Sequence, residues 1–159
     1  TSVTGVQTCA LPILFGALLG DLAGPAARIT SVEGNERATE HAGENLAEWV
    51  GARAETARVD RWTSALRQKI SDRDRERLAR GTVVLDPPRT GAGAAVVDDL
   101  AALGPASIVY VACDPVALAR DLARFADHGY RADLMRGIDL FPHSHHMEAV
   151  ALLRRDAAR

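Results

Sequence analysis

Residues 107–115 read SIVYVACDP and contain the passage from a strand into a helix. Residues 108–111 are a continuous run of β-branched and aromatic side chains, typical of a strand buried on both faces of a parallel sheet. Asp114 is a favourable N-cap and Pro115 a favourable first helical residue, so we expect a helix to begin there. Cys113 is thereby predicted at the carboxyl end of a strand, where open α/β sheets bind ligands.

Cys113 has two interpretations at this position. The positive end of the helix dipole favours its thiolate, although the Asp114 carboxylate opposes part of that effect. The alternative is a small buried hydrophobic residue, which is what a lone cysteine in apolar surroundings usually is. Spacing alone does not decide between a nucleophile and a core cysteine.

The composition is that of one domain. The chain has 159 residues, 47% of them hydrophobic, and a formal net charge of -2, which argues against a protein that holds nucleic acid through overall positive charge. Cys9 and Cys113 provide no disulfide framework, and we find neither a secretory leader nor an apolar run long enough to cross a bilayer. These features predict a location in the reducing cytoplasm.

Residues 1–13, TSVTGVQTCALPI, lack clear periodicity and join abruptly to the Ala- and Leu-rich residues 14–22, which are predicted to be a helix. We interpret residues 1–13 as a non-native leader outside the fold, and residues 14–159 as the domain. Cys9 lies in the leader and is assigned no role.

Two acidic residues close the first predicted strands. Residues 28–32 form a strand pattern that ends at Glu33, and helical spacing follows over residues 38–49. In nucleotide-binding α/β folds a carboxylate there accepts hydrogen bonds from ribose hydroxyls, whereas the alternative for Glu33 is an exposed acid in the first turn of a helix. A weaker strand, residues 55–59, ends at Asp60, and the charged residues 61–80 are predicted to be one helical segment.

Residues 82–85 form another apolar strand, which runs into DPPRTGAG at residues 86–93. Two prolines and two glycines exclude regular structure and predict a stiff loop that begins at Asp86. A rigid loop with an acid and the cation Arg89 is suited to positioning a ligand, although an ordinary turn and a surface ion pair are the alternatives. Residues 94–103 are predicted to form the next helix.

The carboxyl-terminal part contains a strand pattern at residues 130–136 and a final strand at about residues 149–153. Between them lie His143, His145 and His146. We do not expect a metal site here, because adjacent histidines cannot easily point at one ion and a second set of ligands is absent.

Strands that alternate with helices, each strand closed by a polar or reactive residue, predict a doubly wound, mostly parallel α/β sheet. The segments DPPRTGAG, IVYVACDP, ARDL and DLFPHSHHMEAV together resemble the catalytic domain of the RNA 5-methyluridine methyltransferases. That resemblance covers about residues 14–153. It implies a Rossmann-like class I fold, S-adenosylmethionine as cofactor, and methylation of uracil in tRNA or ribosomal RNA.

Matched position by position, the resemblance implies that Cys113 is the nucleophile and Glu148 the base that removes a proton. The residues that match cofactor contacts of the family are Leu14, Glu33, Asp60 and Asp86. The sequence departs from the family before Leu14, where TCALPI replaces a glycine-containing acidic loop, and the family's amino-terminal RNA-binding portion is absent from this sequence.

Two other functions remain open. One is a cysteine hydrolase that uses Cys113 with a nearby histidine. The other is a non-catalytic domain that binds only a cofactor or a partner.

Overall fold

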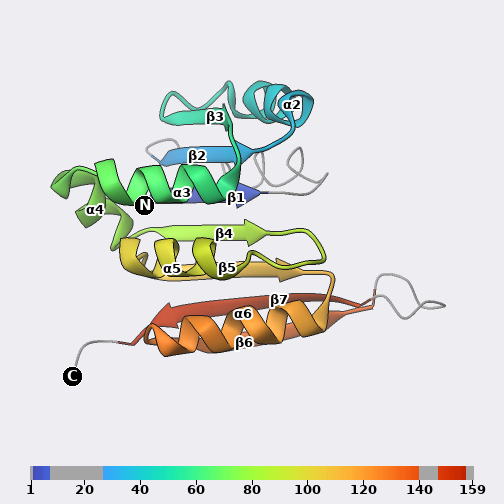
Figure 1. Cartoon of the computed structure of the whole chain (residues 1–159). Helices are drawn as coiled ribbons and strands as arrows, with labels where there is room; N and C mark the ends of the chain where they lie inside the picture. The colour runs from blue at the N-terminus through green and yellow to red at the C-terminus, as the bar shows by residue number, and fades with distance from the viewer. Residues whose placement is uncertain (1, 8–26, 140–146, 157–159) are drawn as a thin grey trace.

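The computed structural model describes residues 2–7, 27–139 and 147–156. Seven strands form a single sheet in the order β3-β2-β1-β4-β5-β7-β6 (Figure 1). The elements are β1 (Ser2–Gln7), β2 (Arg28–Glu33), α2 (Glu36–Leu46), β3 (Ala52–Thr56), α3 (Val59–Lys69), α4 (Asp72–Leu78), β4 (Thr82–Asp86), α5 (Ala94–Leu103), β5 (Ser107–Ala112), α6 (Pro115–Asp127), β6 (Tyr130–Ile138) and β7 (Glu148–Arg155).

Strands β1 to β5 run parallel, and only β7 is reversed, pairing antiparallel with both β5 and β6. The chain order reverses between β1 and β4, so the crevice at their carboxyl ends is the place where a sheet of this kind binds a ligand. The predicted doubly wound, mostly parallel sheet is confirmed.

Strand β1 corrects one prediction. Residues 2–7 were expected outside the fold, but they lie between β2 and β4, with Val3 in register with both Ile29 and Thr82. The unpaired edges of β2 and β4 present backbone donors and acceptors that need partners, and any short extended segment can supply them without a visible periodicity. That residues 1–13 are non-native in origin stays a prediction. The helix expected over residues 14–22 lies outside the described residues.

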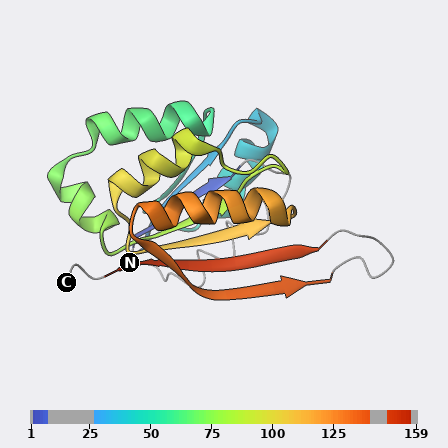
Figure 2. The ribbon, with the colours of Figure 1, turned by 60° about the horizontal axis from the view of Figure 1, so that its bottom comes forward.

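Helices cover both faces of the sheet. Figure 2 shows α3, α5 and α6 along one face of the sheet. Apolar side chains of these helices belong to the same core cluster as Leu85, Ile108 and Tyr110 of the strands. A smaller cluster on the other face joins Leu46 of α2 to Val84. Strand β4 is therefore buried on both sides. In β5 Ile108, Tyr110 and Ala112 are buried, and Val109 and Val111 are half-buried, so the prediction for this strand holds fully for one face.

The segment predicted as a helix over residues 61–80 is two helices. Ile70 adopts an extended backbone and ends α3, and the hydroxyl of Ser71 then accepts a hydrogen bond from the Asp74 amide at 3.2 Å to begin α4. An N-cap serine inside a charged run was a stop signal that the helical spacing hid. No helix among the described residues is long and apolar enough to cross a membrane.

Candidate active site

Glu33 is the last residue of β2 and is almost completely buried, with 6% of its surface exposed. Its Oε1 accepts a hydrogen bond from the Asn35 amide at 2.8 Å. Its Oε2 is also buried, yet it has no hydrogen-bond partner among the described residues. A buried carboxylate oxygen is costly unless it accepts a hydrogen bond, so Oε2 is suited to a ligand that donates one. The alternative of an exposed acid in a helix is wrong, because Glu33 precedes α2.

Asp60 does not close a strand, as the sequence suggested. Strand β3 ends at Thr56, and Asp60 lies in the first turn of α3, where the helix dipole favours an acid. The Arg58 guanidinium binds its carboxylate through two hydrogen bonds of 3.1 and 2.7 Å. These hydrogen bonds hold the pKa of Asp60 below its ordinary value, so the carboxylate is charged at neutral pH.

The DPP loop begins where β4 ends. Asp86 is the last residue of β4, is buried, and stands in register with Gln7 at the carboxyl end of β1. Pro88 accepts a hydrogen bond from the Gly91 amide at 2.8 Å, which closes a turn, and Gly91 has a φ of 82° that side chains rarely adopt. Arg89 is exposed on this loop. The predicted loop without regular structure is confirmed, and its stiffness stays a prediction.

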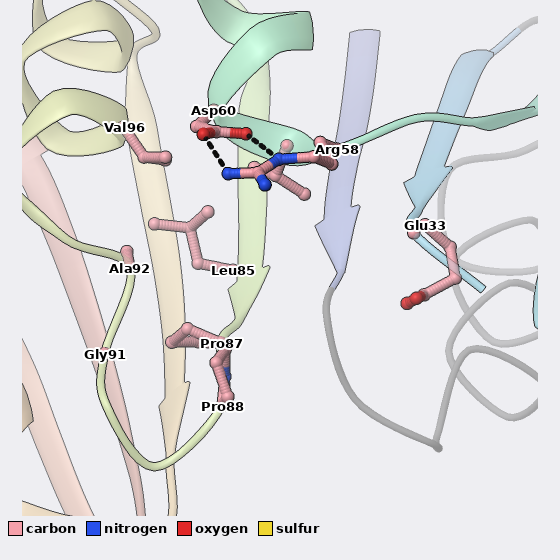
Figure 3. A pocket seen from close by; sticks show the side chains of 11 residues that line it. Glu33, Arg58, Asp60, Leu85, Pro87, Pro88, Gly91, Ala92 and Val96 are labelled. Atoms are coloured by element: carbon pink, nitrogen blue, oxygen red, sulfur yellow. Dashed lines mark hydrogen bonds and ion pairs between the residues drawn. The ribbon is translucent and has the colours of Figure 1, made fainter.

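These elements enclose a cavity of about 360 Å³. Figure 3 shows Glu33 on one side of it, Leu85 and the two prolines on the other, and the Arg58–Asp60 pair above. Its lining residues are Glu33, Gly34, Arg58, Val59, Asp60, Leu85, Pro87, Pro88, Gly91, Ala92 and Val96. A mostly apolar cavity of this size with a few carboxylates at its rim has the character of a small-molecule site.

Cys113 lies just after β5, half-buried, next to the same loop. A narrow crevice beside it is lined by Pro87, Pro88 and Gly91, the residues that also line the cavity. The Asp114 side chain accepts a hydrogen bond from the Ala117 amide at 2.8 Å, as expected for the N-cap of α6. The predicted position of Cys113 at a strand end is therefore confirmed, while its chemical role is not tested by position.

Glu148 is brought next to Cys113 by the reversed strand. Ala112 at the end of β5 pairs with Ala149 near the start of β7, so Cys113 and Glu148 follow and precede one matched pair. Glu148 is half-buried at this edge of the sheet. The two residues, 35 positions apart in sequence (148 − 113 = 35), thus lie at neighbouring strand ends.

The structure does not describe every residue that the sequence singled out. Leu14, His143, His145 and His146 lie outside the described residues. Within residues 27–139 and 147–156, no three His, Cys, Asp or Glu side chains are grouped to hold a metal ion. No role was predicted for Tyr110 or for Asp121 of the ARDL segment. The available signal is the spacing of Asp121 from Ala117 and Phe125, which puts a carboxylate on the buried face of an amphipathic helix.

Comparison with known proteins identifies the family. Residues 55–156 match the tRNA (uracil-5-)-methyltransferase family. The chain belongs to this family. It is 43% identical over 140 residues to an uncharacterized RNA methyltransferase of Streptomyces avermitilis, and 44% identical over 141 residues to one of Streptomyces coelicolor. These matches cover 88% of this chain but 30% and 29% of those relatives, so the chain spans about a third of their length.

Solved structures agree with the family and the fold. One similar structure is the crystal structure of Pyrococcus abyssi tRNA (uracil-54, C5)-methyltransferase in complex with S-adenosyl-L-homocysteine. The match covers 94% of this uracil-5-methyltransferase family chain and 33% of the Pyrococcus abyssi chain, with a TM-score of 0.69 and 30% identity. The N-methyltransferase NodS of Bradyrhizobium japonicum has a TM-score of 0.67 at 10% identity, which shows the fold alone. The domain thus has the Rossmann-like class I fold of S-adenosylmethionine-dependent methyltransferases.

Proposed function

We propose that this domain uses S-adenosylmethionine to methylate carbon 5 of uridine in tRNA or ribosomal RNA through a covalent adduct with Cys113. The observation that supports this most strongly is the pairing of Ala112 with Ala149, because Cys113 follows one of these residues and Glu148 precedes the other at neighbouring strand ends. Cys113 also lines a crevice that shares Pro87, Pro88 and Gly91 with the cavity. The family to which the chain belongs supports the same reaction. The proposed location is the cytoplasm, because Cys9 and Cys113 provide no disulfide framework of the kind that secreted domains use.

Several features of the cavity support its assignment to the cofactor. The buried Glu33 Oε2, which lacks a partner among the described residues, would accept a hydrogen bond from a ribose hydroxyl of the nucleoside. Asp60 lines the cavity from the first turn of α3, and Asp86 lies at the base of the loop that forms the opposite wall. When bound, S-adenosylmethionine supplies a methyl group on a positively charged sulfur, which is open to attack by a carbon nucleophile.

Cys113 supplies that nucleophile indirectly. Carbon 5 of uracil is too weak a nucleophile unaided. The Cys113 thiolate adds to carbon 6, and the electrons of the carbon 5–carbon 6 double bond move to an enolate with electron density on carbon 5. Carbon 5 can then form its new bond to the methyl group, with the reacting atoms held in line by the two adjoining sites. The bond from that methyl group to the cofactor sulfur would break at the same time, and its electron pair would stay on the sulfur of S-adenosylhomocysteine, the leaving group.

Glu148 completes the reaction. Its carboxylate removes the proton from carbon 5, the electrons of that bond restore the double bond to carbon 6, and the bond to sulfur breaks to release the Cys113 thiolate. The target base must leave its stack to reach this edge of the sheet. The Cys113 thiolate is regenerated when its bond to carbon 6 breaks, and the Glu148 carboxylate is regenerated when it passes its proton to solvent.

The test is covalent capture of RNA that contains 5-fluorouridine, whose carbon 5 carries no proton for Glu148 to remove. We would use the domain completed to the length of its relatives, because it spans about a third of them. The wild-type protein should form an adduct that survives denaturing electrophoresis, and Cys113→Ala should form none. Cys9→Ala is the matched thiol control and should behave as wild type. Adduct formation by Cys113→Ala would overturn the proposal.

A second candidate is a domain that binds the cofactor without catalysis, in which the cavity and the buried Glu33 carboxylate serve binding alone. Binding of S-adenosylhomocysteine by the completed wild-type protein with no adduct to fluorinated RNA would favour this candidate.

A further inference from the structure

A buried polar network joins β5, α6 and the DPP loop. Tyr110 and Asp121 are 0% and 1% exposed. The Tyr110 hydroxyl donates to Asp121 Oδ2 at 2.6 Å, and the Ala92 amide donates to the same oxygen at 2.7 Å. Burial raises the pKa of Tyr110 most, and the hydrogen bond to Asp121 raises it further. The hydroxyl therefore stays protonated and remains a hydrogen-bond donor.

Arg120 adds a second link to the loop. Its guanidinium donates to Asp121 Oδ1 through Nε and Nη2, both at 3.1 Å, and Nη2 also donates to the Thr90 carbonyl at 2.6 Å. Both oxygens of a nearly inaccessible carboxylate are therefore occupied. Removing a carboxylate from water costs free energy, so buried carboxylates are normally fully hydrogen-bonded, as Asp121 is here.

The contacts of this network converge on the loop backbone at both sides of Gly91. If the network served only to hold α6 against β5, the bond from Tyr110 to Asp121 would be enough. Instead the Thr90 carbonyl and the Ala92 amide are both bound. A Cβ added at Gly91 would lie 2.5 Å from Arg120 Nη2 and 2.6 Å from Asp121 Oδ2, so loop and network are packed together without spare room.

The loop that they hold is a shared wall. Pro87, Pro88 and Gly91 line both the cavity beside Glu33 and the crevice beside Cys113. A movement of this wall changes the shape of the two sites together, whereas a rigid wall keeps their relative position constant. That relative position matters because a misplacement of about 1 Å between reacting groups can reduce a rate about 100-fold.

We infer that Asp121 is a positioning residue, which with Tyr110 and Arg120 fixes the wall between the cavity and Cys113. The significance of the two sites rests on the proposed function. The fixing of this wall by Asp121, Tyr110 and Arg120 does not depend on the proposed function, and it can be tested without any reaction on RNA.

The test compares Asp121→Asn with Asp98→Asn. The control is matched because Asp98 also binds an arginine of α6, Arg124, at 2.6 Å, yet it contacts neither the loop nor the cavity. In Asp121→Asn an NH2 donor replaces one acceptor oxygen, so either the Tyr110 hydroxyl and the Ala92 amide or the Arg120 guanidinium loses its acceptor.

The melting temperature of each variant of the 159-residue chain would be measured first. Two further quantities would then be measured at a temperature where every variant is folded: the Kd for S-adenosylhomocysteine by calorimetry, and the alkylation rate of Cys113 by iodoacetamide. Peptide mass spectrometry would separate the alkylation of Cys113 from that of Cys9. Asp121→Asn should raise the Kd about tenfold or more and change the Cys113 alkylation rate several-fold. Asp98→Asn should change neither, even where its melting temperature falls as far.

A folded Asp121→Asn protein with both the wild-type Kd and the wild-type alkylation rate would overturn the inference. If Asp121→Asn does not fold, Arg120→Gln replaces it. This side chain is 59% exposed, and its loss removes only the link to Thr90 and one pair of bonds to Asp121. Arg120→Gln should shift the Kd and the alkylation rate in the same direction by a smaller factor. An Arg120→Gln protein with no shift in either quantity would also overturn the inference. Failure of the wild-type chain to bind S-adenosylhomocysteine would count against the cofactor assignment, and the alkylation rates would still decide the role of Asp121.

Discussion

Glu33→Gln separates the cost of burying the Glu33 carboxylate from its use in binding. Oε1 is engaged by the Asn35 amide at 2.8 Å, and Oε2 faces the cavity without a partner among the described residues. In glutamine the carbonyl oxygen can keep the bond to Asn35. The NH2 group then occupies the place of Oε2 and offers a ribose hydroxyl a donor where an acceptor stood.

The magnitude follows from the loss of one hydrogen bond to a charged group, about 1.5–3 kcal/mol. Since about 1.4 kcal/mol corresponds to a factor of ten, the Kd for S-adenosylhomocysteine should rise about tenfold to 150-fold. The ligand-free protein should not become less stable, because a neutral amide is less costly to bury than a charged carboxylate. Binding and stability should therefore respond differently to the same substitution.

Thermal unfolding with and without S-adenosylhomocysteine measures both responses. At a ligand concentration about 100 times the wild-type Kd, wild-type protein should gain about 2.7 kcal/mol, and a variant with tenfold weaker binding about half of that. Glu36→Gln is the control, because Glu36 is an exposed acid three residues farther along that does not line the cavity. An unchanged Kd in Glu33→Gln, or an equal rise in Glu36→Gln, would refute the reasoning.

Three further predictions concern other parts of the domain. In the completed protein, Glu148→Gln should transfer one methyl group and stall as a Cys113–RNA adduct that carries labelled methyl, because glutamine cannot accept the carbon 5 proton; wild-type turnover without an adduct would exclude Glu148 as the base. Hydrogen bonds from Arg124 and His128 lower the pKa of Asp98 from 3.8 to about 2, so its stabilisation is present above about pH 4 and disappears as the pH falls through about 2. Urea unfolding of Asp98→Asn should show a loss of about 1 kcal/mol or less at pH 7, since the pair is exposed, and none near pH 2; a loss that grows on acidification would contradict this. Phe125→Ala, which removes a fully buried ring packed edge-on against Tyr130, should cost about 3–5 kcal/mol in urea unfolding, and a cost below about 1 kcal/mol would show that the core closes around the gap.

Local order was predictable from the sequence because local signals set it. Asp114 and Pro115 predicted the start of α6, and the structure has Asp114 as its N-cap. The apolar run before Cys113 predicted β5, and the proline and glycine residues predicted the stiff DPP loop. Caps, turns and hydrophobic runs act over a few residues, so they can be read without knowing the partner strands.

The same local signals failed where competing patterns overlapped. Asp60 was placed at the end of a strand, but the β3 strand stops four residues earlier and Asp60 begins a helix. Ser71 divided a segment that helical spacing made continuous. Strand β1 was overlooked because its place in the sheet depends on the free edges of β2 and β4, which are far from it in sequence.

Apart from β1 and the break between α3 and α4, the sequence by itself determined the order of the described strands and helices. It also placed a thiol at the end of a strand and carboxylates near other strand ends. Only the tertiary structure decided which of these groups meet. The reversed β7 strand brings Glu148 beside Cys113, and the fold of α6 over β5 brings Asp121 to Tyr110 and to the loop at Ala92. Such contacts depend on strand pairing and helix packing across 11 to 35 positions of sequence, a separation over which no local periodicity carries information.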